Sequence, residues 1–223
     1  MNNGTLAHRA LFDGVRNIIF DLGGVLYNID YHLVEQELSA LQHSGAATLP
    51  RVLYTRETQP AVFMRYEVGS ISTHEFYTAI RQELGIEATD MEIARAWNAM
   101  LLGMYPGRNA LIWRVKQRYR LALLSNTNEL HIEHIKPECT ELFSLFEKLF
   151  FSYEMGMRKP EKAIFFKVLH DMGYIPEETL FIDDSYQHIQ AARECGLRTL
   201  WLQHPDSLDL AVDMLVPRVE SVL

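Results

Sequence analysis

The chain has 223 residues, of which 48% are hydrophobic and 22% are charged, as in an ordinary soluble globular protein. Its formal net charge of −8 repels nucleic-acid backbones and anionic lipids, which argues against nucleic acid or a membrane as partner. No apolar run approaches the ~20 residues of a membrane span. Two cysteines are too few for a disulfide framework, and residues 1–14 lack the apolar core of a signal peptide. We therefore expect a cytoplasmic protein.

Five short runs rich in Val, Ile, Leu and Phe have the length of buried strands. Such continuous runs are typical of parallel strands, which are covered on both faces. Segments of helical period separate the later runs, and Gly173 and Gly196 are placed as helix C-caps. The pattern predicts an α/β fold with a parallel sheet and helices on both faces. The predicted strands are 17–22, 120–125, 149–152, 179–183 and 198–202.

Residues 28–105 show a different pattern, with no comparable strand run. Two capping boxes, Ser72 with Glu75 and Thr89 with Glu92, each precede apolar positions at helical spacing. We therefore expect about four helices inserted after the first strand, although they would also be compatible with a continued α/β core. The predicted domains are a discontinuous α/β core of residues 1–27 and 106–223 and a small α-helical domain of residues 28–105.

Polar residues directly follow four of the five predicted strands. In an open parallel sheet, ligands bind outside the carboxyl ends of the strands, where the loops converge. Each signal alone is weak, because Asp, Ser and Asn are ordinary turn and cap residues. Together they describe a site. Its residues are Asp21 after the first strand, Ser125 and Asn126 after the second, Lys159 after the third, and Asp183 and Asp184 after the fourth.

Four motifs resemble those of the haloacid dehalogenase-like hydrolases, whose members are mostly phosphatases. In chain order they are FDLGGVL, LLSNTN, GMRKPE and IDDS. The resemblance covers essentially the whole chain, and EVGSISTHEFYTAIRQELGI is similar to the helical cap of that family. It implies a Rossmann-like sheet in which strand one is central, between strands two and four, with residues 28–105 as the cap domain.

The resemblance implies a phosphatase that uses Mg²⁺ as cofactor and Asp21 as nucleophile. A carboxylate can attack phosphorus and form an aspartyl-phosphate, which divides hydrolysis into two displacements. A hard cation with oxygen ligands neutralises the charge of an anionic phosphoryl group. Carried over by position, the Mg²⁺ ligands would be the Asp21 and Asp184 carboxylates and the Gly23 carbonyl. Asp183 would bind directly or through water.

The same resemblance assigns the phosphate-binding residues. Ser125 and the loop amides would hold the phosphoryl oxygens, and Asn126 would help to orient them. Lys159 would pair with both the phosphoryl group and the Asp21 carboxylate.

Each of these residues also has a structural alternative. Asp184 with Gln187 makes an acceptable capping box, and Ser125 is an acceptable helix cap. Lys159 before a proline is compatible with a solvated loop charge. Asp21 followed by two glycines is compatible with a simple turn.

Three histidines lie near the motifs. His131 and His134 match no zinc-protease spacing, so we expect them on a solvated helix face. His188 stands where relatives of the family often have Asn, and we expect it to be a neutral polar substitute.

Gly23 departs from the pattern of the family, whose phosphatases usually carry a second aspartate at this position as general acid and base. Losing such proton transfer typically costs a factor of ~10²–10⁴. Asp30, Arg65 and Glu67 are candidates to replace it from a closing cap. Water would serve if the leaving group is a weak base, as in an anomeric sugar phosphate or an acyl phosphate.

The DLGxV form of the first motif occurs in a subgroup that resembles α-D-glucose-1-phosphate phosphatase. Gly23 is therefore compatible with activity, and we favour a small phosphorylated metabolite, with a sugar phosphate as the sharper expectation. One alternative is a catalytically weak regulator that binds phosphometabolites or a protein. A metal-free 2-haloacid dehalogenase is another, but that pattern has Tyr at the position of Gly23 and no use for Asp183 with Asp184. The sequence fixes neither the substrate nor the oligomeric state.

Overall fold

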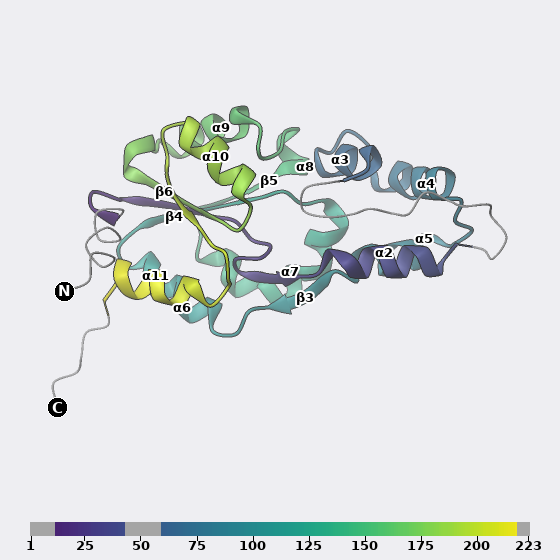
Figure 1. Ribbon diagram of the computed structural model, residues 1–223, viewed down its shortest axis with the longest axis horizontal. Coiled ribbons are helices and arrows are strands. Elements are labelled where there is room, and N and C mark those ends of the chain that lie inside the picture. Colours follow the sequence, from purple (N-terminus) through teal and green to yellow (C-terminus); the bar gives the residue numbers. More distant parts are fainter. Residues whose placement is uncertain (1–11, 43–58, 218–223) are drawn as a thin grey trace.

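The computed structural model describes residues 12–42 and 59–217. Its centre is a five-stranded sheet in the order β5-β4-β1-β6-β7, and every pairing is parallel (Figure 1). β1 lies between β4 and β6, so the predicted central position is confirmed. All five predicted strands are present, with ends that differ by at most two residues. They are β1 (Asn17–Phe20), β4 (Arg120–Ser125), β5 (Lys148–Phe151), β6 (Thr179–Asp183) and β7 (Arg198–Trp201).

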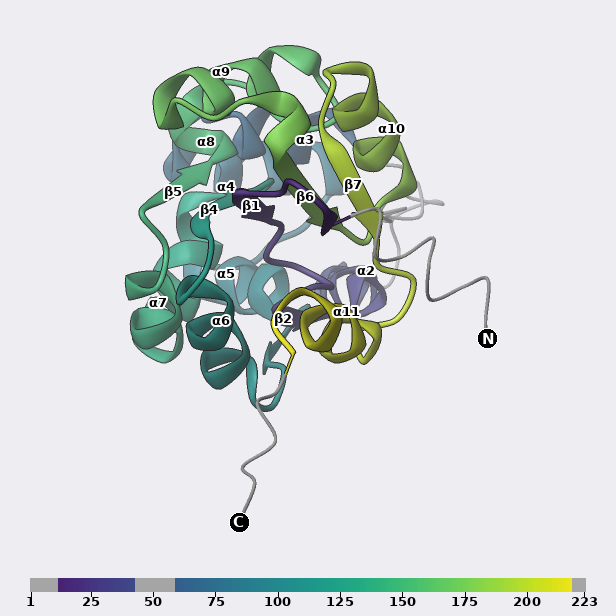
Figure 2. The ribbon, with the colours of Figure 1, turned by 90° about the vertical axis from the view of Figure 1, so that its left-hand side faces the viewer.

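Helices cover both faces of this sheet, as predicted (Figure 2). Side chains of β1 alternate between the two layers: Ile18 and Phe20 pack against α6, α7 and α11, whereas Ile19 packs against α9 and α10. All three side chains are fully buried, which explains why the strand reads as a continuous apolar run. The covering helices are α6 (Arg108–Lys116), α7 (Glu129–Ser144), α9 (Lys162–Met172), α10 (Tyr186–Glu194) and α11 (Ser207–Leu215).

Four further helices lie together at one end of the molecule, at the right in Figure 1. They share a separate hydrophobic cluster, in which Phe63 stacks on Trp97 with ring centroids 4.7 Å apart. Both predicted capping boxes are present, at Ser72 and at Thr89. We call these four the cap helices: α2 (Tyr31–Ala40), α3 (Ala61–Glu67), α4 (Thr73–Leu84) and α5 (Asp90–Asn98).

The described residues of this insertion contain four helices, in agreement with the prediction of about four, whereas the domain boundaries stay a prediction. Residues 1–11, 43–58 and 218–223 of the predicted domains lie outside the described residues.

Two short strands, which the sequence pattern of residues 28–105 does not indicate, flank the cap helices. β2 (Tyr27–Ile29) and β3 (Leu101–Met104) pair antiparallel where the chain leaves the core for the cap helices and where it returns. Both strands are short and partly exposed, so neither gives an apolar run. Glu138 of α7 accepts hydrogen bonds of 2.8 Å from the Tyr27 hydroxyl and from the Met104 amide. The ribbon is therefore fixed to the core by a contact distant in sequence.

The remaining elements are short. α8 (Ser152–Met155) follows β5 directly, and a 3₁₀ turn (Pro176–Glu178) precedes β6. Gly173 is the C-cap of α9 in the left-handed conformation, as predicted; Gly196 comes one residue after the C-cap of α10. Among the described helices, none has the length and apolarity needed to cross a bilayer.

Candidate active site

The predicted site residues converge beyond the carboxyl ends of β1, β4 and β6. The strand register pairs Phe20 with both Leu123 and Ile182, so the residues after β1 and at the end of β6 lie side by side. A pocket of about 80 Å³ opens there. Asp183 contacts Lys159 directly beneath it. The pocket lining includes Asp21, Gly23, Ser125, Asn126, Lys159 and Asp184.

Lys159 is the centre of this arrangement. Its side chain is fully buried, and Nζ lies 2.8 Å from Asp21 Oδ1 and 2.7 Å from Asp183 Oδ2. The Leu124 carbonyl accepts a third bond of 3.1 Å from the same nitrogen. An ammonium group has three N–H donors, so all of them are used. The alternative of a solvated loop charge is wrong, because the ammonium bridges two buried carboxylates.

Two buried carboxylates therefore share one ammonium. Burial raises the pKa of Asp21 to about 6; Asp183 adds to this rise and Lys159 opposes it. Burial acts in the same direction on Asp183, but Lys159 and His188 outweigh it and hold the pKa of Asp183 below its usual range. The Leu22 amide also donates to Asp21 Oδ1 at 2.7 Å. The simple-turn alternative therefore does not describe Asp21, which is buried among charged partners.

Asp184 reaches the Asp21 turn across Gly24. A Cβ atom on Gly24 would lie 1.9 Å from Asp184 Oδ2, and Gly24 has φ +74°. Only glycine combines this backbone conformation with the required space. The capping-box alternative for Asp184 is wrong, since Ser185 is the N-cap of α10 and no side chain caps that helix. Trp201 Nε1 donates to the Asp184 carbonyl at 3.1 Å and holds the same turn.

Ser125 and Asn126 line the pocket with different surroundings. Ser125 is buried and does not cap α7, because the N-cap is Asn128. Asn126 exchanges two 2.9 Å bonds with the backbone of Lys159: Nδ2 donates to its carbonyl and Oδ1 accepts from its amide. The Asn126 side chain thus fixes the loop that carries Lys159. Its predicted contact with phosphate stays a prediction.

The solvated position expected for His131 is wrong, although His134 three residues later is exposed. His131 stacks on Trp97 of α5 with centroids 4.7 Å apart, and its Nε2 lies 3.2 Å from the Trp97 carbonyl. Burial lowers the pKa of His131 to about 3. The cap helices cover this turn of α7, and helical spacing alone does not show such a contact.

His188 lies beside the carboxylate pair. Its Nδ1 is 3.0 Å from each oxygen of Asp183, and the ring lines the pocket. The Ser185 amide donates to Asp183 as well, at 2.7 Å. Both carboxylate oxygens of Asp183 therefore already have hydrogen-bond partners. This arrangement is compatible with a residue whose role is to orient Lys159.

The charges around the pocket fit a divalent cation. Among the described residues in or directly beneath it there are four carboxylates and two cations, an excess of two negative charges. Ligand atoms of Asp21, Asp183 and His188 lie within 4.8 Å of one another. The carboxylate oxygens among these atoms are hard donors, which suit Mg²⁺. The residues counted are Asp21, Glu67, Asp183 and Asp184 against Arg158 and Lys159.

Of the three residues considered as substitutes for an acid at Gly23, only Glu67 lines the pocket. Asp30 caps α2 by accepting a bond from the His32 amide, and Arg65 pairs with Glu83 on the surface. Neither is part of the pocket lining. Glu67 is itself paired with Arg158.

Sequence reasoning missed the contacts that join the cap helices to the core. Ser152 Oγ donates to the Glu67 carbonyl at 2.6 Å and accepts from the Thr127 amide at 2.9 Å. Gly69 has no room for a side chain, since a Cβ would lie 2.2 Å from the Tyr153 carbonyl oxygen. A serine and a glycine at element ends give no sequence signal for such contacts.

A parallel sheet whose central strand ends beside a buried Asp–Lys–Asp cluster, under a helical insertion, defines a class of Rossmann-like hydrolases. Residues 15–196 match the family model described as haloacid dehalogenase-like hydrolase. The chain belongs to this family.

The relatives of the chain include several phosphatases, and one relative of a different activity, the drimenol cyclase drtB of Aspergillus calidoustus, is 27% identical over 198 residues, which cover 87% of this chain and 35% of the relative. The D-ribitol-5-phosphate phosphatase of Bacteroides thetaiotaomicron is 30% identical over 190 residues, which cover 83% of this chain and 90% of the relative. A phosphoglycolate phosphatase of Pseudomonas putida is 27% identical, with coverage of 87% and 72%. A crystal structure of a family enzyme from B. thetaiotaomicron, a mutant complexed with magnesium and inorganic phosphate, superposes with a TM-score of 0.76. It is 32% identical, with coverage of 83% and 93%.

Proposed function

We propose that the protein is a Mg²⁺-dependent phosphatase that hydrolyses a small phosphorylated metabolite through an aspartyl-phosphate on Asp21. The observation that carries the proposal is the Lys159 ammonium shared between Asp21 and Asp183 at the pocket floor. The phosphatase relatives and the magnesium and phosphate in the related crystal structure support it.

In this mechanism Asp21 attacks phosphorus and the leaving-group oxygen departs. Asp21, Asp184 and the Gly23 carbonyl would hold the Mg²⁺, which would supply positive charge against the phosphoryl oxygens. Lys159 offsets negative charge on the nucleophile and on the phosphoryl oxygens. Ser125 donates a hydrogen bond to the phosphoryl group. Water then attacks phosphorus and releases Asp21 together with inorganic phosphate.

Gly23 offers no proton to the leaving group, and none of the three candidate cap residues is placed as an unpaired acid in the pocket lining. Glu67, the one of the three candidates in the pocket lining, is paired with Arg158 at 3.1 Å. We therefore propose that the physiological leaving group departs with help from water alone. A sugar phosphate with a weakly basic leaving oxygen meets this condition.

Residues 28–105 would form the cap that closes over the substrate, and a cytoplasmic location is supported by two cysteines that are both free and buried. The acidic net charge disfavours nucleic acid and anionic membranes as partners.

The test is a screen of phosphorylated metabolites with and without Mg²⁺, beside Asp21→Asn. We expect Mg²⁺-dependent phosphate release that Asp21→Asn abolishes. If no compound gives such release, the phosphatase proposal fails and the phosphometabolite-binding regulator takes its place. Metal-independent chloride release from 2-haloacids would instead support the dehalogenase.

The role of Gly23 has its own test on sugar 1-phosphates. We expect the native protein to turn them over without Gly23→Asp. Inert native protein beside an active Gly23→Asp variant would contradict this. A Cβ at this position would lie 2.9 Å from Ile29 Cδ1, the end of a flexible side chain, so the variant can be accommodated.

A further inference from the structure

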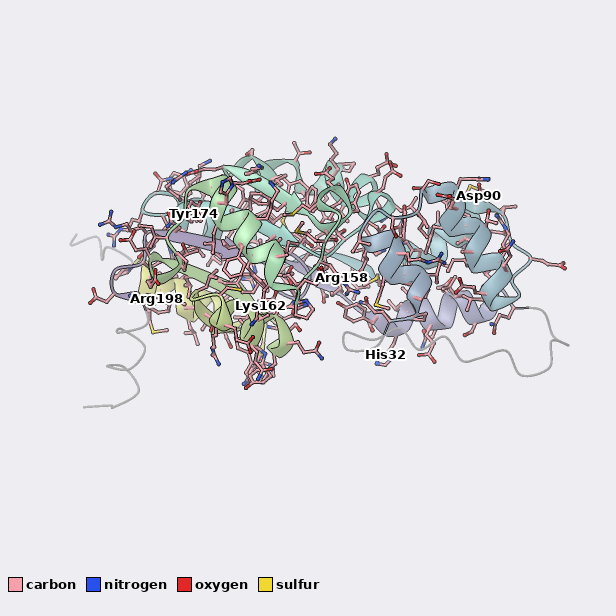
Figure 3. The ribbon with its side chains drawn as sticks, turned by 90° about the horizontal axis from the view of Figure 1, so that it is seen from above. His32, Asp90, Arg158, Lys162, Tyr174 and Arg198 are labelled. Carbon is pink, nitrogen blue, oxygen red and sulfur yellow. The ribbon has the colours of Figure 1, made fainter. Side chains whose placement is uncertain are left out.

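Three buried side chains join the first turn of α7 to a cap helix. In Figure 3, Asp90, at which α5 begins, lies at the outer end of the molecule, and Arg158 lies where the α/β core meets the cap helices. α5 therefore runs toward the core, and Trp97 is its penultimate residue. The Trp97 indole stacks on the ring of His131, and its Nε1 donates to Oδ1 of Asn128 at 3.2 Å. All three of these side chains are buried.

The hydrogen bonds among these three residues determine which nitrogen of His131 carries the proton. Asn128 Oδ1 accepts from two groups that can only donate, the Trp97 indole and the His131 amide, which is 3.1 Å away. This identifies the oxygen of the Asn128 side chain, so its Nδ2 must donate to His131 Nδ1 at 3.1 Å. Because Nδ1 accepts, the proton of the neutral ring is on Nε2, which donates to the Trp97 carbonyl at 3.2 Å.

Both ring nitrogens of His131 are therefore used inside the protein, although the ring is part of the pocket lining. A second proton on Nδ1 would face the amide group of Asn128, so that two donors would oppose each other. Burial acts against that proton as well, because it lowers the pKa of His131 to about 3. The imidazole is thus a neutral bridge between the Trp97 carbonyl and Asn128.

Asn128 ends the loop that carries the two predicted phosphate-binding residues, Ser125 and Asn126. It is also the N-cap of α7, so its backbone fixes where the loop stops and the helix starts. The neighbouring Thr127 is held from the other side, since its amide donates to Ser152 Oγ at 2.9 Å. The end of this loop is therefore gripped between the core and a cap helix.

We propose that Trp97 and His131 are positioning residues, which hold Asn128 and thereby keep the loop of Ser125 and Asn126 in the geometry that binds phosphoryl oxygens. Trp97 does not line the pocket, and His131 has no ring nitrogen left for a substrate, so both act through Asn128. The inference rests on the proposed function only in placing the phosphoryl group at this loop.

Amide hydrogen exchange tests the coupling without any ligand. Trp97→Phe keeps an aromatic ring beside His131 but removes the indole N–H that binds Asn128. The amides of Thr127 and His131 donate to Ser152 Oγ and to Asn128 Oδ1. We expect both amides to exchange at least about fivefold faster in Trp97→Phe than in native protein. Unchanged exchange at both amides would overturn the inference.

The matched control is Phe76→Leu. Phe76 packs against Trp97 in the same hydrophobic cluster, with ring centroids 5.4 Å apart, but a phenyl ring has no hydrogen bond to lose. The substitution loosens the packing of the cap helices and leaves Asn128 bonded. Exchange of the Thr127 and His131 amides should stay within about twofold of native protein. Equal acceleration in both variants would overturn the inference, because general loosening would then be the cause.

Phosphate affinity tests the positioning role itself. Inorganic phosphate is titrated by calorimetry, in the presence of Mg²⁺, into native protein and into the Trp97→Phe and Phe76→Leu variants. We expect Trp97→Phe to bind phosphate at least about fivefold more weakly and Phe76→Leu to match native protein. Faster exchange in Trp97→Phe with unchanged phosphate affinity would overturn the positioning role.

Substitutions of His131 give a second arm if Trp97→Phe fails to fold. His131→Gln keeps a neutral donor for the Trp97 carbonyl, whereas His131→Leu removes every hydrogen bond of the ring. We expect His131→Gln to retain more of the native phosphate affinity than His131→Leu, and the reverse order would overturn the inference. If native protein binds no phosphate, the phosphate site of the proposed function fails, and amide exchange alone decides whether Trp97 and His131 hold the loop.

Discussion

The Nζ atom of Lys159 lies 2.8 Å from Oδ1 of Asp21, in a place where water has no access to the ammonium. The same ammonium serves Asp183, so one cation stabilises two buried carboxylates. Removing one partner of a buried ion pair is far more costly than removing an exposed one, because the remaining charge stays desolvated. The position of the nucleophile and the stability of the core thus depend on the same lysine.

Lys159→Met should lower the free energy of unfolding by about 3–5 kcal/mol, because both buried aspartates lose their shared ammonium partner. Phosphate release should fall at least about 10³-fold, since the nucleophile loses its charge partner. Urea denaturation and a phosphate assay measure the two effects. Lys162→Met, three residues later and exposed in its pair with Glu194, is the control and should change neither. Similar losses in both variants would contradict this account.

Gly24→Ala should abolish Mg²⁺ binding, because the new Cβ would occupy the position of the Asp184 carboxylate. Gly107→Ala is a close control: its φ of +77° resembles the +74° of Gly24, but nothing lies within 4 Å of the added Cβ. Both variants introduce backbone strain at a positive φ, but only Gly24→Ala adds a steric clash, so the larger loss of stability is expected in Gly24→Ala. Calorimetric titration with Mg²⁺ separates them, and retained affinity in Gly24→Ala would show that Asp184 is not held in this way.

Asp183 and Asp184 should respond differently to replacement by asparagine. Asp184→Asn should weaken Mg²⁺ binding at least about tenfold, because a charged oxygen ligand is lost. Asp183→Asn should mainly lower stability, since both oxygens of Asp183 are engaged by Lys159, His188 and the Ser185 amide. Magnesium titration and thermal unfolding of the two variants measure this contrast. A larger loss of affinity in Asp183→Asn would reverse the assignment.

His131 should make stability fall as the pH is lowered. Burial lowers its pKa to about 3 in the folded protein from the ordinary 6.5 of a histidine, so below pH 6.5 the unfolded chain binds a proton that the folded one does not. Between pH 6.5 and 5 the free energy of unfolding should fall by about 2 kcal/mol through this group. His131→Gln should remove that part of the dependence in urea titrations at each pH, with His134→Gln as control. An unchanged slope in His131→Gln would contradict the burial of a neutral imidazole.

The sheet and the site loops follow from local sequence, because buried parallel strands are continuous apolar runs and the polar residues after them must meet at one edge. The β2–β3 ribbon was missed because its short, partly exposed strands are defined by their pairing and by Glu138, which is distant in the chain. His131 was misplaced for a related reason, since Trp97 buries it from another helix.

Contacts in the site between segments that are distant in the chain could not be predicted from the sequence either. The family motifs indicate that Lys159 acts near Asp21, but no spacing rule pairs Arg158 with Glu67 or directs Trp201 Nε1 to the Asp184 carbonyl. These contacts arise from how the loop ends and the cap helices pack, which hydrophobic periodicity does not encode.

Trapping the phosphorylated enzyme tests the central claim most directly. The native protein is mixed with Mg²⁺ and radiolabelled acetyl phosphate, whose weakly basic leaving group needs no acid, and the reaction is stopped with acid on the millisecond scale. Without a general base at Gly23 the second step should be slow, so label should accumulate on the peptide that carries Asp21. Asp21→Asn protein and metal-free protein should carry none. Phosphate release without label on that peptide at any time, or label on Asp21→Asn, would contradict Asp21 as the nucleophile.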